Sequence, residues 1–494
     1  MKSIWEQWLL VYRQKIKGYR REGIKMKLYH YRSIKSALLE LENGTFHFAA
    51  REELNDPMEG FVRVYWQGDK AAWEGLFRHY IYSVGRALEL YIEESNEKIL
   101  QHNSLVIDIH QFDDISFGAL LRKLGTEFLK EPYVQMLIEF YGGHSLKVTE
   151  KELRYIIRLI HNKALVNCLR EFSKRGLIEE KEAEHFIRIF DQSLPVKKII
   201  ETMDQGLSDE NKRIQITEIA ENFFEDVQEF TYIFRALKDE VFLYGNPSTD
   251  KKRESVSKAQ QHRNWLIISF DFPKVFVEQL KNMIYPESYV VCFSGKNDDS
   301  AMWGNYADCH KGVCLIYDTK DEDKINVKVS NHYIPLAVKA VSYGGNIIER
   351  NFFHTFGRLN MKQIKEWLLG TEKISSCYQE VFYEQEKWRN CYWETYDAKT
   401  YRKTKAWEHE NEFRAALTNT FGEFNKPEQR NVSYEWTLLK GIIFGINTTE
   451  YDKKRIMDKL LENKKNLEDF CFYQAEYDEE KQKIVIRKKV VWKL

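Results

Sequence analysis

The chain has 494 residues, and its 43% hydrophobic and 14% aromatic content suffices for a sizeable core and excludes a largely disordered protein. Its 75 lysines and arginines balance 75 aspartates and glutamates, so the whole chain has no net field to concentrate a polyanion. Nucleic-acid binding would therefore need a local basic patch.

The seven cysteines are few for this length and odd in number, which indicates reduced thiols and a cytoplasmic protein. Cys309 and His310, followed by Cys314, are spaced somewhat like metal ligands, but no second pair follows at zinc-site distance. We therefore expect packing roles for them and no metal. No run of about 18 apolar residues occurs, so we expect no membrane span.

Residues 1–24 are expected to form an N-terminal amphipathic helix. Apolar side chains recur there at helical spacing, at Ile4, Trp5, Trp8, Leu9, Tyr12 and Ile16. Basic residues follow them, a pattern that also suits a helix lying on a membrane surface. A helix packed onto its own domain is the simpler interpretation.

Residues 25–66 are expected to form the first part of an α+β domain. Aromatic alternation predicts a strand over 27–32, and Ser33 and Gly44 have the right positions to begin and end a helix over 34–42. A strand over 45–49 follows, then the turn-rich connector Leu54-Asn55-Asp56-Pro57-Met58-Glu59-Gly60.

Residues 67–284 are expected to form a large all-helical insertion. Apolar residues at spacings of three and four predict long helices over 71–92, 115–141, 149–175, 179–192 and 214–243. The segment Thr149-Glu150-Lys151-Glu152 has the pattern of a capping box that begins one of them. No fixed repeat period occurs, which argues against a solenoid.

Residues 285–494 are expected to complete the α+β domain. Strands are predicted over 288–294, 312–318, 333–341, 412–418 and 441–444, with a final hairpin over 472–477 and 483–492. Helices are predicted over 300–306 and 449–466, and an aromatic-rich helical stretch over 348–401. The fold class is therefore α+β, a split mixed-sheet domain interrupted by the helical insertion.

The segment Glu410-Asn411-Glu412-Phe413-Arg414 is the first candidate for chemistry. If it is extended, alternation places Glu410, Glu412 and Arg414 on one face. Two neighbouring carboxylates repel each other, and an adjacent arginine relieves that repulsion. Such a group suits the stabilisation of positive charge or the orientation of hydroxyl groups, although a solvated strand edge would have the same pattern.

His30 and Arg32 would share one face of the first strand, at the N-terminus of the helix that follows. An arginine in that position is a reasonable pyrophosphate ligand, because the guanidinium donates bidentately and the helix amides add a positive pole. The alternative is that His30 and Arg32 are ordinary surface residues that bind no ligand. Ser294 lacks the Gly-x-Ser-x-Gly pattern of a nucleophile elbow, so a serine hydrolase is disfavoured.

Taken in order, seven blocks resemble a bacterial family of unknown function whose members are labelled abortive phage-resistance proteins of the AbiGi type. These blocks are Tyr29-His30-Tyr31-Arg32-Ser33, Leu41-Glu42-Asn43-Gly44, Leu54-Asn55-Asp56-Pro57-Met58-Glu59-Gly60, Cys292-Phe293-Ser294, Met302-Trp303-Gly304-Asn305-Tyr306-Ala307 with His310-Lys311-Gly312-Val313-Cys314, Glu410-Asn411-Glu412-Phe413-Arg414 and Ile442-Ile443-Phe444-Gly445. The resemblance covers the split domain and implies nothing about the helical insertion.

The same residues are distantly similar to the ADP-ribosyltransferase pattern, which implies an ADP-ribosyltransferase-like fold with NAD as substrate. By that resemblance, Arg32 or His30 would hold the NAD phosphates or the adenosine ribose. Ser294 would brace the site, and Tyr306 would stack on nicotinamide. Glu412, or alternatively Glu410, would stabilise the transition state as nicotinamide leaves. Trp303 and Arg414 complete the expected cofactor-binding set.

The resemblance thus implies a cytoplasmic anti-phage effector, an NAD-consuming toxin-like transferase that modifies a macromolecular acceptor, protein or nucleic acid. An antitoxin or regulatory partner would accompany it. The helical insertion, to which the resemblance does not extend, is expected to serve target recognition, inhibition or self-association. The alternative is a non-enzymatic defence or interaction protein whose helical insertion binds a protein or nucleic-acid partner. Fold analogy alone does not decide between them.

Overall fold

The protein is described by a computed structural model that divides the chain into two compact units. Unit 1 comprises Met1–Val62, Pro286–Ile348 and Trp393–Leu494, and unit 2 comprises Arg63–Tyr285 and Glu349–Tyr392. The residues that the structure describes are 26–92, 108–112, 116–190, 214–215, 217–220, 222, 267–319, 323–329, 331–420, 422–463 and 470–489. The helix expected over 1–24 lies outside them, as does nearly all of the one expected over 214–243.

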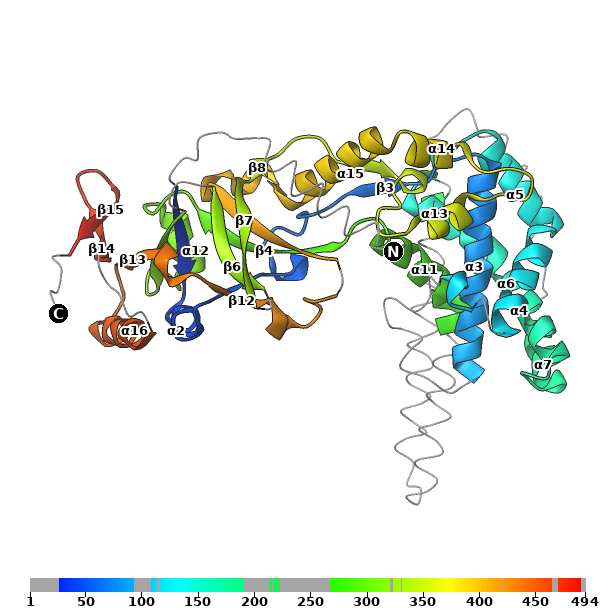
Figure 1. Ribbon diagram of the computed structural model, residues 1–494, viewed down its shortest axis with the longest axis horizontal. Coiled ribbons are helices and arrows are strands. Elements are labelled where there is room, and N and C mark those ends of the chain that lie inside the picture. Colours follow the sequence, from blue (N-terminus) through cyan, green and yellow to red (C-terminus); the bar gives the residue numbers. More distant parts are fainter. Residues whose placement is uncertain are drawn as a thin grey trace, which may run out of the picture. The chain divides into compact units, whose positions relative to one another are not determined.

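Unit 1 is built on a large mixed sheet (Figure 1). In spatial order its strands are β15 (Lys483–Lys488), β14 (Cys471–Asp478), β13 (Leu439–Phe444), β5 (Val313–Asp318), β1 (Lys27–Arg32), β4 (Glu287–Ser294), β11 (Glu412–Asn419), β7 (His332–Ala340), β6 (Lys324–Val329), β12 (Asn431–Tyr434) and β2 (Thr45–His47). β13 and β14 run parallel, and the other neighbouring strands are antiparallel. The mixed-sheet class with both helices and strands is therefore confirmed.

Each face of this sheet buries an apolar core. On one face Leu28, Phe293 and Tyr317 belong to a large core that is covered by α2 (Ile34–Asn43) and α16 (Glu450–Asn463), which lie side by side (Figure 1). On the other face Tyr31 and Trp303 belong to a smaller core beneath α12 (Ser300–Tyr306). We call these the α2 face and the α12 face.

Local sequence signals explain where α2 begins and ends. The hydroxyl of Ser33 accepts a hydrogen bond from the backbone N–H of Ser36 at 3.2 Å, which caps the first turn. Gly44 ends the helix in the left-handed conformation, with φ of 59°. Both expected caps are confirmed, and they position the strand β1 immediately before the helix.

Two short strands pair next to the sheet in unit 1 and matter for the site. β8 (Ser342–Tyr343) and β10 (Arg402–Lys403) run parallel to each other. A 3-10 helix over Lys405–Glu410 then connects β10 to β11. Lys403 and Glu410 therefore lie at the two ends of one short connection.

Unit 2 is mainly helical. Among the residues that the structure describes, its α-helices are α3 (Lys70–Ile92), α4 (Ser116–Leu129), α5 (Pro132–Gly143), α6 (Glu150–Lys174), α7 (Glu180–Phe190), α11 (Phe272–Asn282), α13 (Met361–Leu368) and α14 (Ser376–Tyr383), with a parallel pair of short strands, β3 (Arg63–Tyr65) and β9 (Glu349–Asn351). No described helix is long and apolar enough to cross a membrane.

The helix boundaries of unit 2 differ from the sequence prediction at one place and agree at another. The single helix expected over 115–141 is two helices, because Pro132 occupies the first turn of α5 and cannot continue α4. Thr149 caps α6 as expected, accepting from the backbone N–H of Glu152 at 3.3 Å.

Residues Glu349–Tyr392 group with unit 2, whereas the sequence pattern assigned them to the second part of the α+β domain. β9 pairs with β3, and the ring of Phe353 lies 5.8 Å from that of Trp73 in α3. These aromatic residues therefore pack against the helices and not against the sheet. The next helix, α15 (Gln385–Thr400), begins in unit 2 and ends in unit 1.

Candidate functional site

Segments that lie far apart in the chain meet on the α12 face of the sheet. The register pairs Ser294 of β4 with Tyr29 of β1 on one side and with Glu412 of β11 on the other. Residues directly opposite each other in a sheet share a face, so Ser294 and Glu412 point the same way as Tyr29. Arg414 follows Glu412 by two residues and lies on that face too.

The strand predicted over 412–418 is present as β11, but the residues that lead into it are not extended. Glu410 ends the 3-10 helix, and Asn411 is left-handed with φ of 45° before β11 begins at Glu412. The turn packs against Gly295, whose N–H donates to the carbonyl of Asn411 at 2.8 Å. A Cβ at residue 295 would lie 2.4 Å from the Asn411 Nδ2, so a larger residue there would displace the Asn411 side chain. Despite the turn, both carboxylates reach the same place.

Five ionisable side chains, each at most 5% exposed, form what we call the charge cluster: Glu59, Lys403, Glu410, Glu412 and Arg414. Lys403 Nζ lies 2.6 Å from Glu410 Oε2, 3.4 Å from Glu412 Oε2 and 3.3 Å from Glu59 Oε1. Arg414 donates to both oxygens of Glu412, at 2.7 Å from Nε and 2.9 Å from Nη2. Arg414 Nη2 also lies 2.7 Å from Glu59 Oε2. All five residues belong to unit 1.

The charge cluster has more carboxylates than cations, since three glutamates face one lysine and one arginine. Burial opposes ionisation of Glu412, but the guanidinium of Arg414 together with Lys403 outweighs it, and the pKa of that carboxyl lies below its ordinary value. For Glu59, burial dominates and raises the pKa despite Arg414 and Lys403. The ionised form of Glu412 is thus stabilised by its neighbours, whereas the ionised form of Glu59 is not stabilised enough to offset its burial.

Tyr306 connects the charge cluster to the surface. Its hydroxyl donates to Oε1 of Glu410 and accepts from the side-chain amide of Asn55, which is exposed. Ser294 supports the same glutamate from the other side, because its hydroxyl donates to the Glu410 carbonyl at 2.7 Å. Burial, followed by the neighbouring Glu410, raises the pKa of Tyr306, so this hydroxyl remains a donor.

His30 and Arg32 do not join these residues. Both point to the α2 face, where Glu40 of α2 holds them: its Oε1 lies 3.2 Å from His30 Nδ1, and its Oε2 accepts from Arg32 Nε at 2.8 Å. The ring of His30 lies 5.1 Å from that of Phe293 in the core of that face. The expectation that they share a site with Ser294 and Glu412 is therefore wrong, because alternation along β1 places them across the sheet.

Trp303 lies on the expected face but has no free surface. It is 0% exposed, its ring packs edge-on against Tyr31 at 5.1 Å, and its Nε1 donates to the carbonyl of Asn297 at 2.9 Å. Its contacts are those of a core residue that fixes α12 against the sheet. Through α12 it positions Tyr306.

Sequence reasoning missed Glu59, Lys403 and Asn55 as members of the site. Asn55 and Glu59 belong to the turn-rich block 54–60, whose sequence predicts only a connector between elements. A charged residue two places after proline in a turn could have raised the question of a partner. Lys403 carried no signal, because it stands among other basic residues at 402 and 405.

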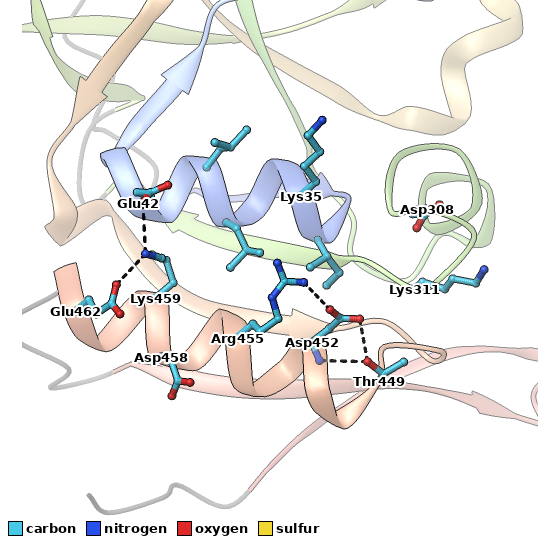
Figure 2. Close-up of a pocket in the computed structure, with 13 residues that line it drawn as sticks. Lys35, Glu42, Asp308, Lys311, Thr449, Asp452, Arg455, Asp458, Lys459 and Glu462 are labelled. Carbon is cyan, nitrogen blue, oxygen red and sulfur yellow. Dashed lines mark hydrogen bonds and ion pairs between the residues drawn. The ribbon is translucent and has the colours of Figure 1, made fainter.

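A cavity of about 730 Å³ lies elsewhere in unit 1, between α2 and α16 (Figure 2). Charges of both signs line it, and Figure 2 shows Lys459 between Glu42 and Glu462, with Arg455 beside Asp452. None of the five charge-cluster residues lines this cavity. Within the described residues, no group of three or more His, Cys, Asp or Glu side chains could hold a metal ion.

Comparison with known proteins gives one match. Residues 302–415 match the model of a family described as "Protein of unknown function (DUF2971)". This segment includes Tyr306, Lys403, Glu410, Glu412 and Arg414, but not Glu59 or Ser294. No curated protein and no solved structure matches the chain. The match thus covers part of the chain, names a family of unknown function, and carries neither the abortive-infection label nor a likeness to ADP-ribosyltransferases.

Proposed function

We propose that the protein is an NAD-consuming enzyme of the ADP-ribosyltransferase class. It acts in the cytoplasm as an anti-phage, abortive-infection effector and modifies a macromolecular target. The observation that carries the proposal is the pair of neighbouring carboxylates in the charge cluster, Glu410 and Glu412, the second of which Arg414 holds ionised. Such carboxylates stabilise positive charge, and the nicotinamide end of NAD carries positive charge that moves to the ribose as the bond breaks.

In the proposed reaction the bond between the ribose anomeric carbon and the nicotinamide nitrogen breaks, and its electron pair leaves with nicotinamide. A nucleophilic atom of the acceptor forms the new bond to that carbon and loses its proton to solvent. Glu412 is the proposed stabiliser of the electron-poor ribose, because Arg414 keeps it ionised. Glu410 is the proposed second carboxylate, oriented by Ser294 and Tyr306.

The proposal differs from what the ADP-ribosyltransferase resemblance implied in the basic residues that take part. His30 and Arg32 have no part in it, because both are tied to Glu40 on the α2 face. Tyr306 remains the proposed ring for nicotinamide, since it is only half-buried and lies between Asn55 and Glu410. Trp303 acts through α12 and does not touch the substrate.

A second candidate function is a non-enzymatic interaction protein, and one observation favours it. Every carboxylate oxygen of Glu410 and Glu412 already accepts from a protein donor: Tyr306 and Lys403 for the first, Arg414 twice for the second. A charge cluster that is complete in itself would brace β10 against β11 and need no substrate. The helices of unit 2 would then bind the partner.

Transfer of labelled ADP-ribose from NAD to an acceptor distinguishes the two candidate functions. Wild-type protein is incubated with NAD labelled in the adenine ring, together with bacterial protein, RNA or DNA in separate reactions. The enzymatic function predicts that wild-type protein transfers label to one of the three fractions. Arg414→Met should transfer none, because Glu412 loses its bidentate partner. Glu40→Gln removes a carboxylate on the α2 face that is as buried as that of Glu412. This variant retains transfer per mole of folded protein. No label in any fraction, together with no consumption of NAD, would favour the interaction protein.

A further inference from the structure

Glu59 differs from the other members of the charge cluster in the segment that carries it and in its hydrogen bonding. It comes from the irregular segment between β2 and β3, whereas Lys403 and Arg414 belong to strands and Glu410 and Glu412 flank a turn fixed by Gly295. It is 1% exposed, yet neither of its carboxylate oxygens accepts a hydrogen bond of normal geometry. It sits at ion-pair distance from both cations, 3.3 Å from Lys403 and 2.7 Å from Arg414.

Without Glu59 the charge cluster would balance. Glu410 and Glu412 would face Lys403 and Arg414, two charges of each sign, and the space between the two cations would be open to another anion. A buried carboxylate that lacks good hydrogen bonds is poorly compensated for the loss of its water. Burial accordingly raises its pKa above the ordinary value. An external anion with more oxygens could therefore compete with it.

The segment that carries Glu59 has the features of a loop able to move. It has turn structure with local hydrogen bonds, from Glu59 N to the Asp56 carbonyl at 3.0 Å and from Phe61 N to the Met58 carbonyl at 3.1 Å. Met58 and Phe61 are 47% and 37% exposed, so these two apolar side chains do not anchor the loop in a core. Its other links to the site are the Asn55 amide on Tyr306 and the Asp56 carboxylate, which accepts from Thr404 N at 2.8 Å.

We propose that the loop 54–62 is a lid and that the Glu59 carboxylate occupies, between Lys403 and Arg414, the place of a diphosphate group of the substrate. This rests on the proposed function in identifying the anion as the diphosphate of NAD. Binding of the diphosphate displaces Glu59, lifts the loop, and exposes Glu412 and Tyr306. It also supplies the phosphate-binding cations that were expected of His30 and Arg32.

Binding of inorganic pyrophosphate to the full chain tests this directly by calorimetric titration. Glu59→Gln removes the competing charge, so it binds pyrophosphate at least about tenfold more tightly than wild type. Glu410→Gln removes the same charge from the same cluster but contacts only Lys403 of the two cations, and it gives a clearly smaller gain. Glu52→Gln, exposed in the neighbouring 3-10 helix, binds like wild type. Equal gains for Glu59→Gln and Glu410→Gln, or no gain for Glu59→Gln, would overturn the lid.

Hydrogen exchange on the wild-type protein provides a test that needs no variant. The backbone amide of Thr404 donates to the carboxylate of Asp56 in the loop at 2.8 Å, and it exchanges faster when pyrophosphate is saturating, because its acceptor leaves with the loop. Unchanged or slower exchange contradicts the proposal. Neither measurement uses cleavage of NAD, so a failure to release nicotinamide would defeat the proposed function and leave the anion site standing.

Discussion

At the scale of the residue, the charge cluster is costly to build and easily broken. Removing several ions from water costs several kcal/mol each, and the cost is recovered only when every charge has close partners. Arg414 has three groups to satisfy, since it also donates to the carbonyl of Thr400 at 3.0 Å. A protein that needed only stability could fill this space with apolar side chains, so the cluster is a reason to look for function.

Removal of Arg414 leaves the carboxylates that it pairs with buried and without their main cation. We expect Arg414→Met to lower the free energy of unfolding by about 3–5 kcal/mol in urea titration, because Glu412 and Glu59 remain buried without their main partner. The double variant Arg414→Met with Glu412→Gln should lose less than the sum of the single variants. Strict additivity would mean that the two side chains do not interact energetically.

Glu59 should make stability depend on pH in a defined direction. Its pKa is higher in the fold than in the unfolded chain, so the folded protein binds more protons. The resulting stabilisation is complete below the ordinary carboxyl pKa and is lost as pH rises through the raised one. Glu59→Gln lacks this loss, so its melting temperature should rise relative to wild type over the pH range above the ordinary carboxyl value of 4.5. A constant difference across that range would contradict the assignment.

Alternation could predict that Glu412 and Arg414 share a face, because that depends only on the period of a strand. It could not predict the left-handed Asn411 or the arrival of Lys403 and Glu59, which depend on tertiary packing. The same rule, applied to β1, separated His30 and Arg32 from Tyr29. It did not say which of the two faces held the site.

At the scale of the element, close backbone approaches fix how helices of unit 2 pack. A Cβ on Gly75 of α3 would lie 1.7 Å from the carbonyl oxygen of Trp367 in α13. We expect Gly75→Ala to lower the free energy of unfolding by about 1–3 kcal/mol, because backbone cannot move aside cheaply. Gly304→Ala in α12 is the matched control, since nothing lies within 4 Å of its Cβ position. Equal effects of the two in urea titration would contradict this packing.

A buried histidine in unit 2 should add acid sensitivity. His161 accepts from the Tyr80 hydroxyl at 2.7 Å and donates to the carbonyl of Ile268 at 2.8 Å, and burial lowers its pKa to about 4. Because the fold holds it neutral, its stabilisation is complete above the ordinary value of 6.5 and is lost as pH falls towards 4. His161→Gln should be less stable at neutral pH but flatter in a plot of melting temperature against pH.

Element types were more predictable than element ends. Strand β5 and the hairpin of β14 and β15 follow from continuous or alternating apolar residues. The break between α4 and α5 follows from Pro132, a signal that was present but overridden by a continuous helical period. The assignment of residues 349–392 could not be derived, because an aromatic-rich helix fits a sheet or a bundle equally well.

At the scale of the whole molecule, two compact units with separate cores should respond separately to mutation. In differential scanning calorimetry Arg414→Met should lower a transition that belongs to unit 1, and Gly75→Ala one that belongs to unit 2. If each variant shifts all of the heat absorption together, the units unfold as one and the division is only geometric.

The central claim is that the charge cluster breaks the nicotinamide bond of NAD. Release of nicotinamide by wild type and by Glu412→Gln, at equal amounts of folded protein, tests it most directly. The claim predicts release by wild type, lowered at least about 100-fold in Glu412→Gln and little changed in Glu40→Gln, because Glu412 faces the developing positive charge whereas Glu40 holds Arg32 on the other face of the sheet. Equal release by wild type and Glu412→Gln, or no release by wild type with any acceptor present, would contradict it.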